Sequence, residues 1–171
     1  MSSRTLVSVE EYLHTSYRPD CDYVDGAIVE RYVGETDHSD CQGRIYAYFL
    51  NRSRQLSVYP LVEERVQVSG SRFRIPDVCV VLGPKPVEQI LTTPPLICIE
   101  ILSKDDRMTA MQERIGDYLQ FGVRYVWVVD PRTRRAWIYT KDGSHESKDG
   151  ILRTENPAIE LPLPEIFQAL E

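Results

Sequence analysis

The sequence predicts one α/β domain with a mixed central sheet flanked by helices. Three β-prone runs follow one another without a long helix between them, and an amphipathic run then separates the third from a continuous apolar run. Consecutive strands without a crossover helix are most simply antiparallel, whereas a strand–helix–strand unit is normally parallel. A chain of 171 residues suits one domain, which we expect to span residues 1–171.

The N-terminal part predicts a short helix and a hairpin. Ser8 and Glu11 have the spacing of a capping box, which opens a helix that ends near Leu13. Asp25-Gly26 lies between two short β-prone runs and is typical of a tight hairpin turn.

Two longer helices are predicted by apolar residues at helical spacing. The first begins at Asp37 or Ser39, and the second has Ser103 as its N-cap and ends at Gly122. Their apolar faces comprise Cys41, Ile45, Tyr48 and Phe49 in the first helix, and Met108, Met111, Ile115, Tyr118 and Leu119 in the second.

The remaining elements are strands and a final short helix. We expect strands at 61–68, 73–82, 96–102, 123–129 and 135–140, and the short helix at 163–167. The fourth strand follows a crossover helix and is nearly continuously apolar, so it should be parallel to the third and buried on both faces.

The composition excludes several classes of protein. No apolar stretch approaches the length of a membrane span, and residues 1–7 lack the pattern of a signal peptide, so we expect a cytoplasmic protein without membrane contact. The four cysteines lack zinc-ribbon spacing. A net charge of −6 argues against a broad nucleic-acid-binding surface but leaves room for a local basic patch.

Asp77 and Glu100 stand at opposite ends of neighbouring β-prone runs. Asp77 precedes the run 78–82, and Glu100 follows Leu96–Ile99. If these runs pair as antiparallel strands, both carboxylates reach the same edge of the sheet, where hard divalent cations would find oxygen ligands. The simpler alternative is that each acid ends its strand in solvent.

The register of the two strands makes this expectation testable. In an antiparallel pair the residue numbers of opposed partners have a constant sum, so pairing Asp77 with Glu100 also pairs Cys79 with Cys98. The two free thiols would then touch on the face that carries the acids. A slip of one residue would send the carboxylates to opposite faces.

Five parts of the chain form a combined pattern: the segments 22–29, His38 at a helix start, Ile75-Pro76-Asp77-Val78, 99–103, and 118–131 with its Tyr-Val-Trp-Val-Val-Asp-Pro sequence. Together they resemble the bacterial Uma-type family of putative restriction endonucleases, in the PD-(D/E)XK nuclease superfamily. The resemblance covers roughly residues 8–140.

This resemblance implies a metal-dependent endonuclease that hydrolyses phosphodiester bonds of DNA. Asp77, Glu100 and the backbone carbonyl of Ile101 would hold Mg²⁺ or Mn²⁺. Lys104 or Arg114 would supply the cation that stabilises the developing charge. Asp22 and His38 would line the cleft.

The chain departs from the family pattern at three positions. Leu102 replaces the superfamily's lysine two residues after the glutamate. Arg114 stands where the family tends to carry a lysine, and it keeps the charge but is poorly suited to act as a base. Asp22 replaces a glutamate.

Three functions therefore remain open. The first is a metal-dependent deoxyribonuclease, and the second is a catalytically impaired nuclease-like fold that binds nucleic acid or another partner. The third is a metal-dependent hydrolase of another phosphate ester. For the nuclease we also expect a homodimer, because cutting a duplex needs two sites.

Overall fold

The computed structural model describes residues 5–32 and 34–167, whose strands form three sheets. The largest has six strands in the order β10 (Gly143–Glu146), β9 (Arg135–Thr140), β8 (Tyr125–Asp130), β7 (Ile97–Ile101), β6 (Val78–Leu82) and β3 (Val58–Val62). The second has four strands in the order β2 (Ala27–Val29), β1 (Asp22–Val24), β5 (Arg72–Arg74) and β4 (Val66–Ser69). The third pairs β11 (Ile151–Thr154) with β12 (Ile159–Pro162).

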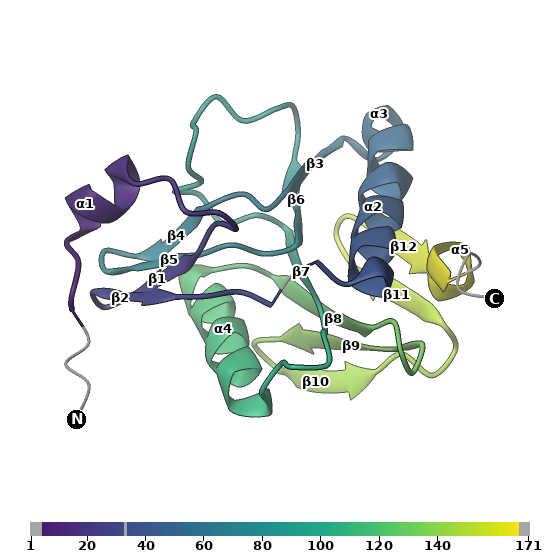
Figure 1. Cartoon of the computed structure of the whole chain (residues 1–171). Helices are drawn as coiled ribbons and strands as arrows, with labels where there is room; N and C mark the ends of the chain where they lie inside the picture. The colour runs from purple at the N-terminus through teal and green to yellow at the C-terminus, as the bar shows by residue number, and fades with distance from the viewer. Residues whose placement is uncertain (1–4, 33, 168–171) are drawn as a thin grey trace.

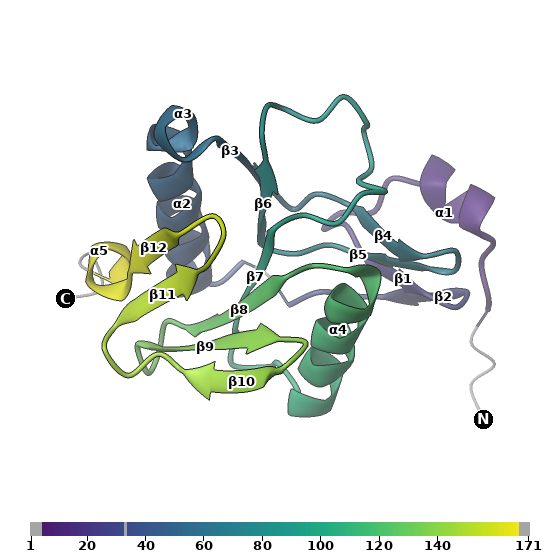
Figure 2. The same cartoon turned by 180° about the vertical axis from the view of Figure 1, so that it is seen from behind.

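Helices cover these sheets. They are α1 (Val9–His14), α2 (Thr36–Asn51), α3 (Ser53–Leu56), α4 (Met108–Phe121) and α5 (Leu163–Phe167). The four-stranded sheet and α1 lie at one end of the molecule, whereas α2, α5 and the β11–β12 hairpin lie at the other (Figures 1 and 2). No helix among the described residues is long and apolar enough to cross a membrane.

The centre of the large sheet has the predicted topology. β3, β6 and β7 are neighbours with antiparallel pairing, and α4 then crosses to β8, which runs parallel to β7. The sequence-based fold class, a mixed sheet flanked by helices, is therefore confirmed.

Two of the predicted strands are divided between two sheets, which the sequence analysis did not anticipate. The expected strand 61–68 separates into the end of β3 and most of β4, with a break at Glu63, whose φ is 50°. The expected strand 73–82 separates into β5 and β6 around Ile75-Pro76-Asp77. Pro76 lacks an N–H and cannot donate to a ladder, so the chain leaves one sheet there and enters the other.

Alternating residues of β6 and β7 pack into two separate cores. Val78, Val80, Ile97, Ile99 and Ile101 face the core that includes the apolar face of α2. Cys79 and Cys98 face the core that includes Met111, Ile115 and Tyr118 of α4. Because Glu100 is two residues from Cys98 on the same strand, its side chain is directed to the α4 face.

The C-terminus of α4 lies where the sequence predicts, but its N-terminus does not. Gly122 ends the helix with φ of 114°, as expected for a left-handed C-cap. The prediction that Ser103 is the N-cap is wrong, because α4 begins at Met108 after Arg107. Ser103 instead belongs to a turn in which its N–H donates to Asp106 Oδ2 at 2.7 Å. Met108 is 68% exposed, so it does not belong to the buried face of α4.

The N-terminal elements agree with the sequence. Ser8 caps α1 by accepting a hydrogen bond from the N–H of Glu11 at 3.1 Å. β1 and β2 form the expected hairpin, with positive φ at Asp25 and Gly26. β1 also pairs with β5, and this pairing brings the hairpin beside the chain that leads to Asp77.

Candidate active site

The register of β6 and β7 brings Asp77 and Glu100 to one edge of the large sheet. Val78 is paired with Ile99, and Cys79 with Cys98. Asp77 immediately precedes β6, and the same register places it opposite Glu100. Both acids are buried, with 3% and 1% exposure, so the alternative that each simply ends its strand in solvent is wrong.

Three donors surround the carboxylate of Asp77. Its Oδ2 accepts a hydrogen bond from the backbone N–H of Ile101 at 2.7 Å. Its Oδ1 lies 2.9 Å from Arg31 Nη2 and 3.3 Å from His38 Nε2. Burial lowers the pKa of His38, but the contact with Asp77 outweighs it, so the pKa of His38 is raised.

The carboxylate of Glu100 faces α4. Its Oε1 accepts a hydrogen bond from the hydroxyl of Tyr118 at 2.6 Å, and its Oε2 lies 3.5 Å from Arg114 Nη1. Burial is the main cause that raises the pKa of Glu100 to about 7, and the charge of Asp77 adds to it, whereas Arg114 and Tyr118 oppose it. Glu100 and Asp77 are thus close enough for their charges to repel each other.

Asp22 joins the hairpin to both β5 and α4. It is fully buried at 0% exposure. Its Oδ2 lies 3.1 Å from Arg74 Nη1 and 3.1 Å from Arg114 Nε, and its Oδ1 accepts the N–H of Ile75 at 3.1 Å. Asp22 therefore helps to orient Arg114, whose other end faces Glu100.

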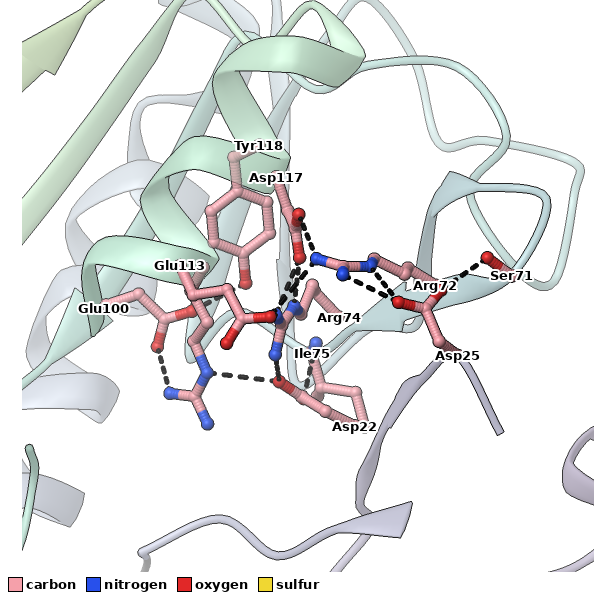
Figure 3. A network of polar contacts seen from close by, with 11 residues as sticks. Asp22, Asp25, Ser71, Arg72, Arg74, Ile75, Glu100, Glu113, Asp117 and Tyr118 are labelled. Carbon is pink, nitrogen blue, oxygen red and sulfur yellow. Dashed lines mark hydrogen bonds and ion pairs between the residues drawn. The ribbon is translucent and has the colours of Figure 1, made fainter. Parts of the chain in front are cut away.

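A chain of ion pairs continues outward from Asp22, as Figure 3 shows. Arg74 Nη2 lies 2.7 Å from Asp117 Oδ2 on α4. Asp117 also binds Arg72, which binds Asp25 in the hairpin turn. This network fastens the hairpin to α4 around the buried acids.

Lys104 is placed differently from the other residues predicted for the site. Its side chain is 66% exposed, and its Nζ lies 3.9 Å from Glu35 Oε1. No ion pair joins Lys104 to Asp77 or Glu100 in the part of the chain that the structure describes. The cation beside Glu100 is therefore Arg114.

Arg31 and the roles of Tyr118 and Arg74 were not predicted from the sequence. Arg31 gave no signal, because it follows a short strand in a polar segment. Tyr118 was assigned only to the apolar face of α4. Arg74 could have been found from register, because the β1–β5 pairing of Tyr23 with Phe73 places Asp22 opposite Arg74.

The residues near Asp77 and Glu100 supply only part of the coordination that a hard cation needs. No group of three or more His, Cys, Asp or Glu side chains suited to a metal occurs within residues 5–32 and 34–167. Asp77 and Glu100 alone offer two carboxylates, which is the protein share typical of a Mg²⁺ site completed by water and substrate phosphate. Their mutual repulsion is what a divalent cation would relieve.

A large surface hollow lies elsewhere. Its volume is about 770 Å³, and its lining includes Gly122, Tyr125 and Thr140. Tyr125 begins β8 and Thr140 ends β9, so the hollow lies at the opposite end of these strands from Asp130 and Arg135. Its lining does not include Asp77 or Glu100.

Comparisons with known proteins identify the family and the fold of the chain. The family model Uma2, described as "putative restriction endonuclease", matches residues 9–171. The fold is similar to the crystal structure of a "putative nuclease belonging to DUF820" from Anabaena variabilis, with a TM-score of 0.82 and 21% sequence identity over 96% of this chain and 99% of that one. No curated protein matches the sequence.

Proposed function

Because the chain belongs to the Uma2 family of putative restriction endonucleases, we propose that it is a metal-dependent endonuclease that hydrolyses phosphodiester bonds of DNA. The observation that carries the proposal is the burial of Asp77 and Glu100 opposite each other at one sheet edge. Burying two repelling carboxylates is costly, and the cost is typical of a functional site.

Asp77 and Glu100, with the backbone carbonyl of Ile101, would hold Mg²⁺ or Mn²⁺. The ion would supply a bound water of lowered pKa and a positive charge for a phosphate oxygen. The N–H of Ile101 fixes Asp77 Oδ2, and the hydroxyl of Tyr118 fixes Glu100 Oε1. These bonds hold each carboxylate in one orientation and leave further lone pairs on its oxygens.

Arg114 would stabilise negative charge that develops on the phosphate. Asp22 binds its Nε, so the guanidinium is oriented before substrate arrives. Arg114 stays protonated at any working pH, because the nearby acids Glu100 and Asp22 outweigh burial and raise its pKa above the ordinary arginine value. It therefore acts as a fixed charge and not as a base.

Cleavage assays test this proposal. Purified protein with Mg²⁺ or Mn²⁺ should cut plasmid DNA, and the Glu100→Gln variant should not. Single-stranded DNA, RNA and a simple phosphate ester, assayed in parallel, separate a deoxyribonuclease from a hydrolase of another phosphate ester. Cleavage of the simple ester alone would contradict the assignment of DNA as substrate.

One observation favours a second candidate function. Arg31 and Arg114 already form ion pairs with Asp77 and Glu100, His38 lies beside Asp77, and Leu102 occupies the position of the superfamily's lysine. A nuclease-like fold whose acids are permanently neutralised would bind nucleic acid or a partner without cutting. Calorimetry separates the candidates, because such a binding module need not bind Mg²⁺ or Mn²⁺.

A homodimer would let two such sites cut both strands of a duplex. Light scattering with the protein alone and with duplex DNA tests this part of the proposal. A monomer at high concentration in both samples would contradict it.

A further inference from the structure

Arg31 has one buried nitrogen without a partner. Its side chain is 2% exposed, and its Nη2 binds Asp77 Oδ1 at 2.9 Å. Its Nη1 is also buried but has no hydrogen-bond partner among the described residues. A buried, charged N–H group without an acceptor destabilises the fold, so such a group calls for an acceptor that the protein alone does not provide.

The position of this nitrogen is fixed by the guanidinium plane. Nη1 and Nη2 share one carbon, so Nη1 lies within the width of one guanidinium of the Asp77 carboxylate. Arg31 follows β2, and the residues on either side of it, Glu30 and Tyr32, are exposed. Arg31 is therefore a buried residue between two exposed ones, and its guanidinium lies beside Asp77, one of the candidate metal ligands.

The other cations near the acids each have a carboxylate partner. Arg114 binds both Asp22 and Glu100, and His38 binds the same Asp77 oxygen as Arg31. Leu102 offers no charge. Arg31 Nη1 is thus a buried cationic donor beside Asp77 that has no acceptor among the described residues.

An anionic oxygen is the acceptor that suits this donor. Guanidinium groups bind phosphate oxygens through charge-assisted hydrogen bonds and hold two acceptors in a fixed relative position. With Asp77 on Nη2, the second acceptor would lie next to the carboxylate that positions the reacting phosphate.

We propose that Arg31 is a catalytic residue that donates a hydrogen bond from Nη1 to a non-bridging oxygen of the DNA phosphate held at Asp77 and Glu100. This inference rests on the proposed nuclease function. Arg31 then serves two anions: it neutralises Asp77 in the free protein and binds phosphate when DNA is present.

The Arg31→Lys variant gives the sharpest test. Lysine retains one charge beside Asp77 but cannot hold two anions in the planar guanidinium arrangement. We expect Arg31→Lys to melt like wild type and to bind Mn²⁺ with similar affinity in calorimetry. Single-turnover cleavage of duplex DNA should be about 100-fold slower, as for loss of one charge-stabilising donor.

Two further measurements on the Arg31→Ala variant test the same role of Arg31. Arg31→Ala should lose cleavage to at least the same extent and regain part of it on addition of guanidinium chloride at non-denaturing concentration. The salt dependence of DNA binding, as log K against log salt, should be shallower by about 0.9 in Arg31→Ala, which corresponds to one lost phosphate contact. Arg54→Ala, which removes an exposed arginine on α3, is the control and should cleave like wild type.

Specific outcomes would overturn the inference. Wild-type cleavage by Arg31→Lys would reduce Arg31 to a counter-ion of Asp77. Faster cleavage with tighter Mn²⁺ binding by Arg31→Ala would mean that Arg31 only occupies the position of the ion. If wild type binds DNA but cuts none, the nuclease function fails by itself, and the salt dependence still decides whether Arg31 binds phosphate. If wild type does not bind DNA, both proposals fail.

Discussion

Cys79 lies directly opposite Cys98 in the antiparallel pair of β6 and β7. Both are free and fully buried on the face that packs against α4. The same register places Asp77, which immediately precedes β6, opposite Glu100 at the edge of the sheet. The pairing of β6 with β7 that opposes the two thiols in the core therefore also sets the relative position of the two acids.

The buried Glu100 predicts an unusual pH dependence of stability. Its pKa in the folded protein is raised from 4.5 to about 7, so the folded state holds a proton that the unfolded state has released. The free energy of unfolding should therefore fall as the pH rises through this range, by on the order of 3 kcal/mol. Urea denaturation in metal-free buffer measures this.

The Glu100→Gln variant isolates that effect. The free energy of unfolding of this variant should not fall over that pH range. The variant should therefore become more stable relative to wild type as the pH rises. Glu160→Gln removes an exposed carboxylate and should retain the wild-type pH dependence. An unfolding free energy of wild type that rises between pH 5 and 7 would contradict a raised pKa at Glu100.

Tyr118→Phe tests the hydrogen bond that orients Glu100. The substitution removes the hydroxyl that donates to Oε1 at 2.6 Å and leaves a buried carboxylate with fewer donors. We expect a loss of about 1–3 kcal/mol in the free energy of unfolding, measured in urea at neutral pH.

The control is Tyr46→Phe on α2. The hydroxyl of Tyr46 has no hydrogen bond to another described residue, so its removal should change stability by less than about 0.5 kcal/mol. If both substitutions changed the free energy of unfolding equally, the Tyr118 hydroxyl would stabilise the fold no more than the hydroxyl of Tyr46 does.

Arg114 should contribute charge and orientation to cleavage. Arg114→Met leaves Asp22 and Glu100 without their shared cation, and we expect about a 100-fold slower single-turnover rate. Arg114→Lys retains the charge and should be less impaired than the methionine variant. Lys104→Met provides the matched control, because Lys104 is exposed and pairs with Glu35. A larger loss of cleavage rate in Lys104→Met than in Arg114→Met would assign the charge-stabilising role to Lys104 and not to Arg114.

The sequence predicted the centre of the fold because its signals there are local. The apolar runs of β6, β7 and β8 and the helical spacing in α4 are each readable within a few residues. The positions of Asp77 and Glu100 at the ends of such runs then followed from strand pairing alone.

The rest of the site depends on contacts that no local pattern encodes. Arg31 reaches Asp77 across 46 positions of the chain, and Asp22 reaches Arg114 across 92. The prediction for Lys104 assumed that the strand continues past Ile101, but β7 ends there and the following turn directs Lys104 to Glu35. The transfer of two strands between sheets likewise depends on Pro76 and Glu63 in their three-dimensional setting.

Asp22→Asn should destabilise the protein strongly. Asp22 is fully buried and accepts hydrogen bonds from Arg74, Arg114 and the N–H of Ile75. An amide would remove one buried anionic partner from each of Arg74 and Arg114, whose closest remaining carboxylates would be Asp117 and Glu100. We therefore expect a loss of about 3–5 kcal/mol in the free energy of unfolding. Asp149→Asn, at an exposed ion pair with Arg153, should cost less than about 1 kcal/mol.

The metal site itself is tested by a crystal soaked in Mn²⁺ and measured at an X-ray energy where manganese scatters anomalously. We expect an anomalous peak between the carboxylates of Asp77 and Glu100, with Arg31 still beside Asp77. The absence of a peak at these two acids in fully soaked crystals, with both carboxylates still bound to Arg31 and Arg114, would contradict a metal-dependent nuclease and favour the binding module.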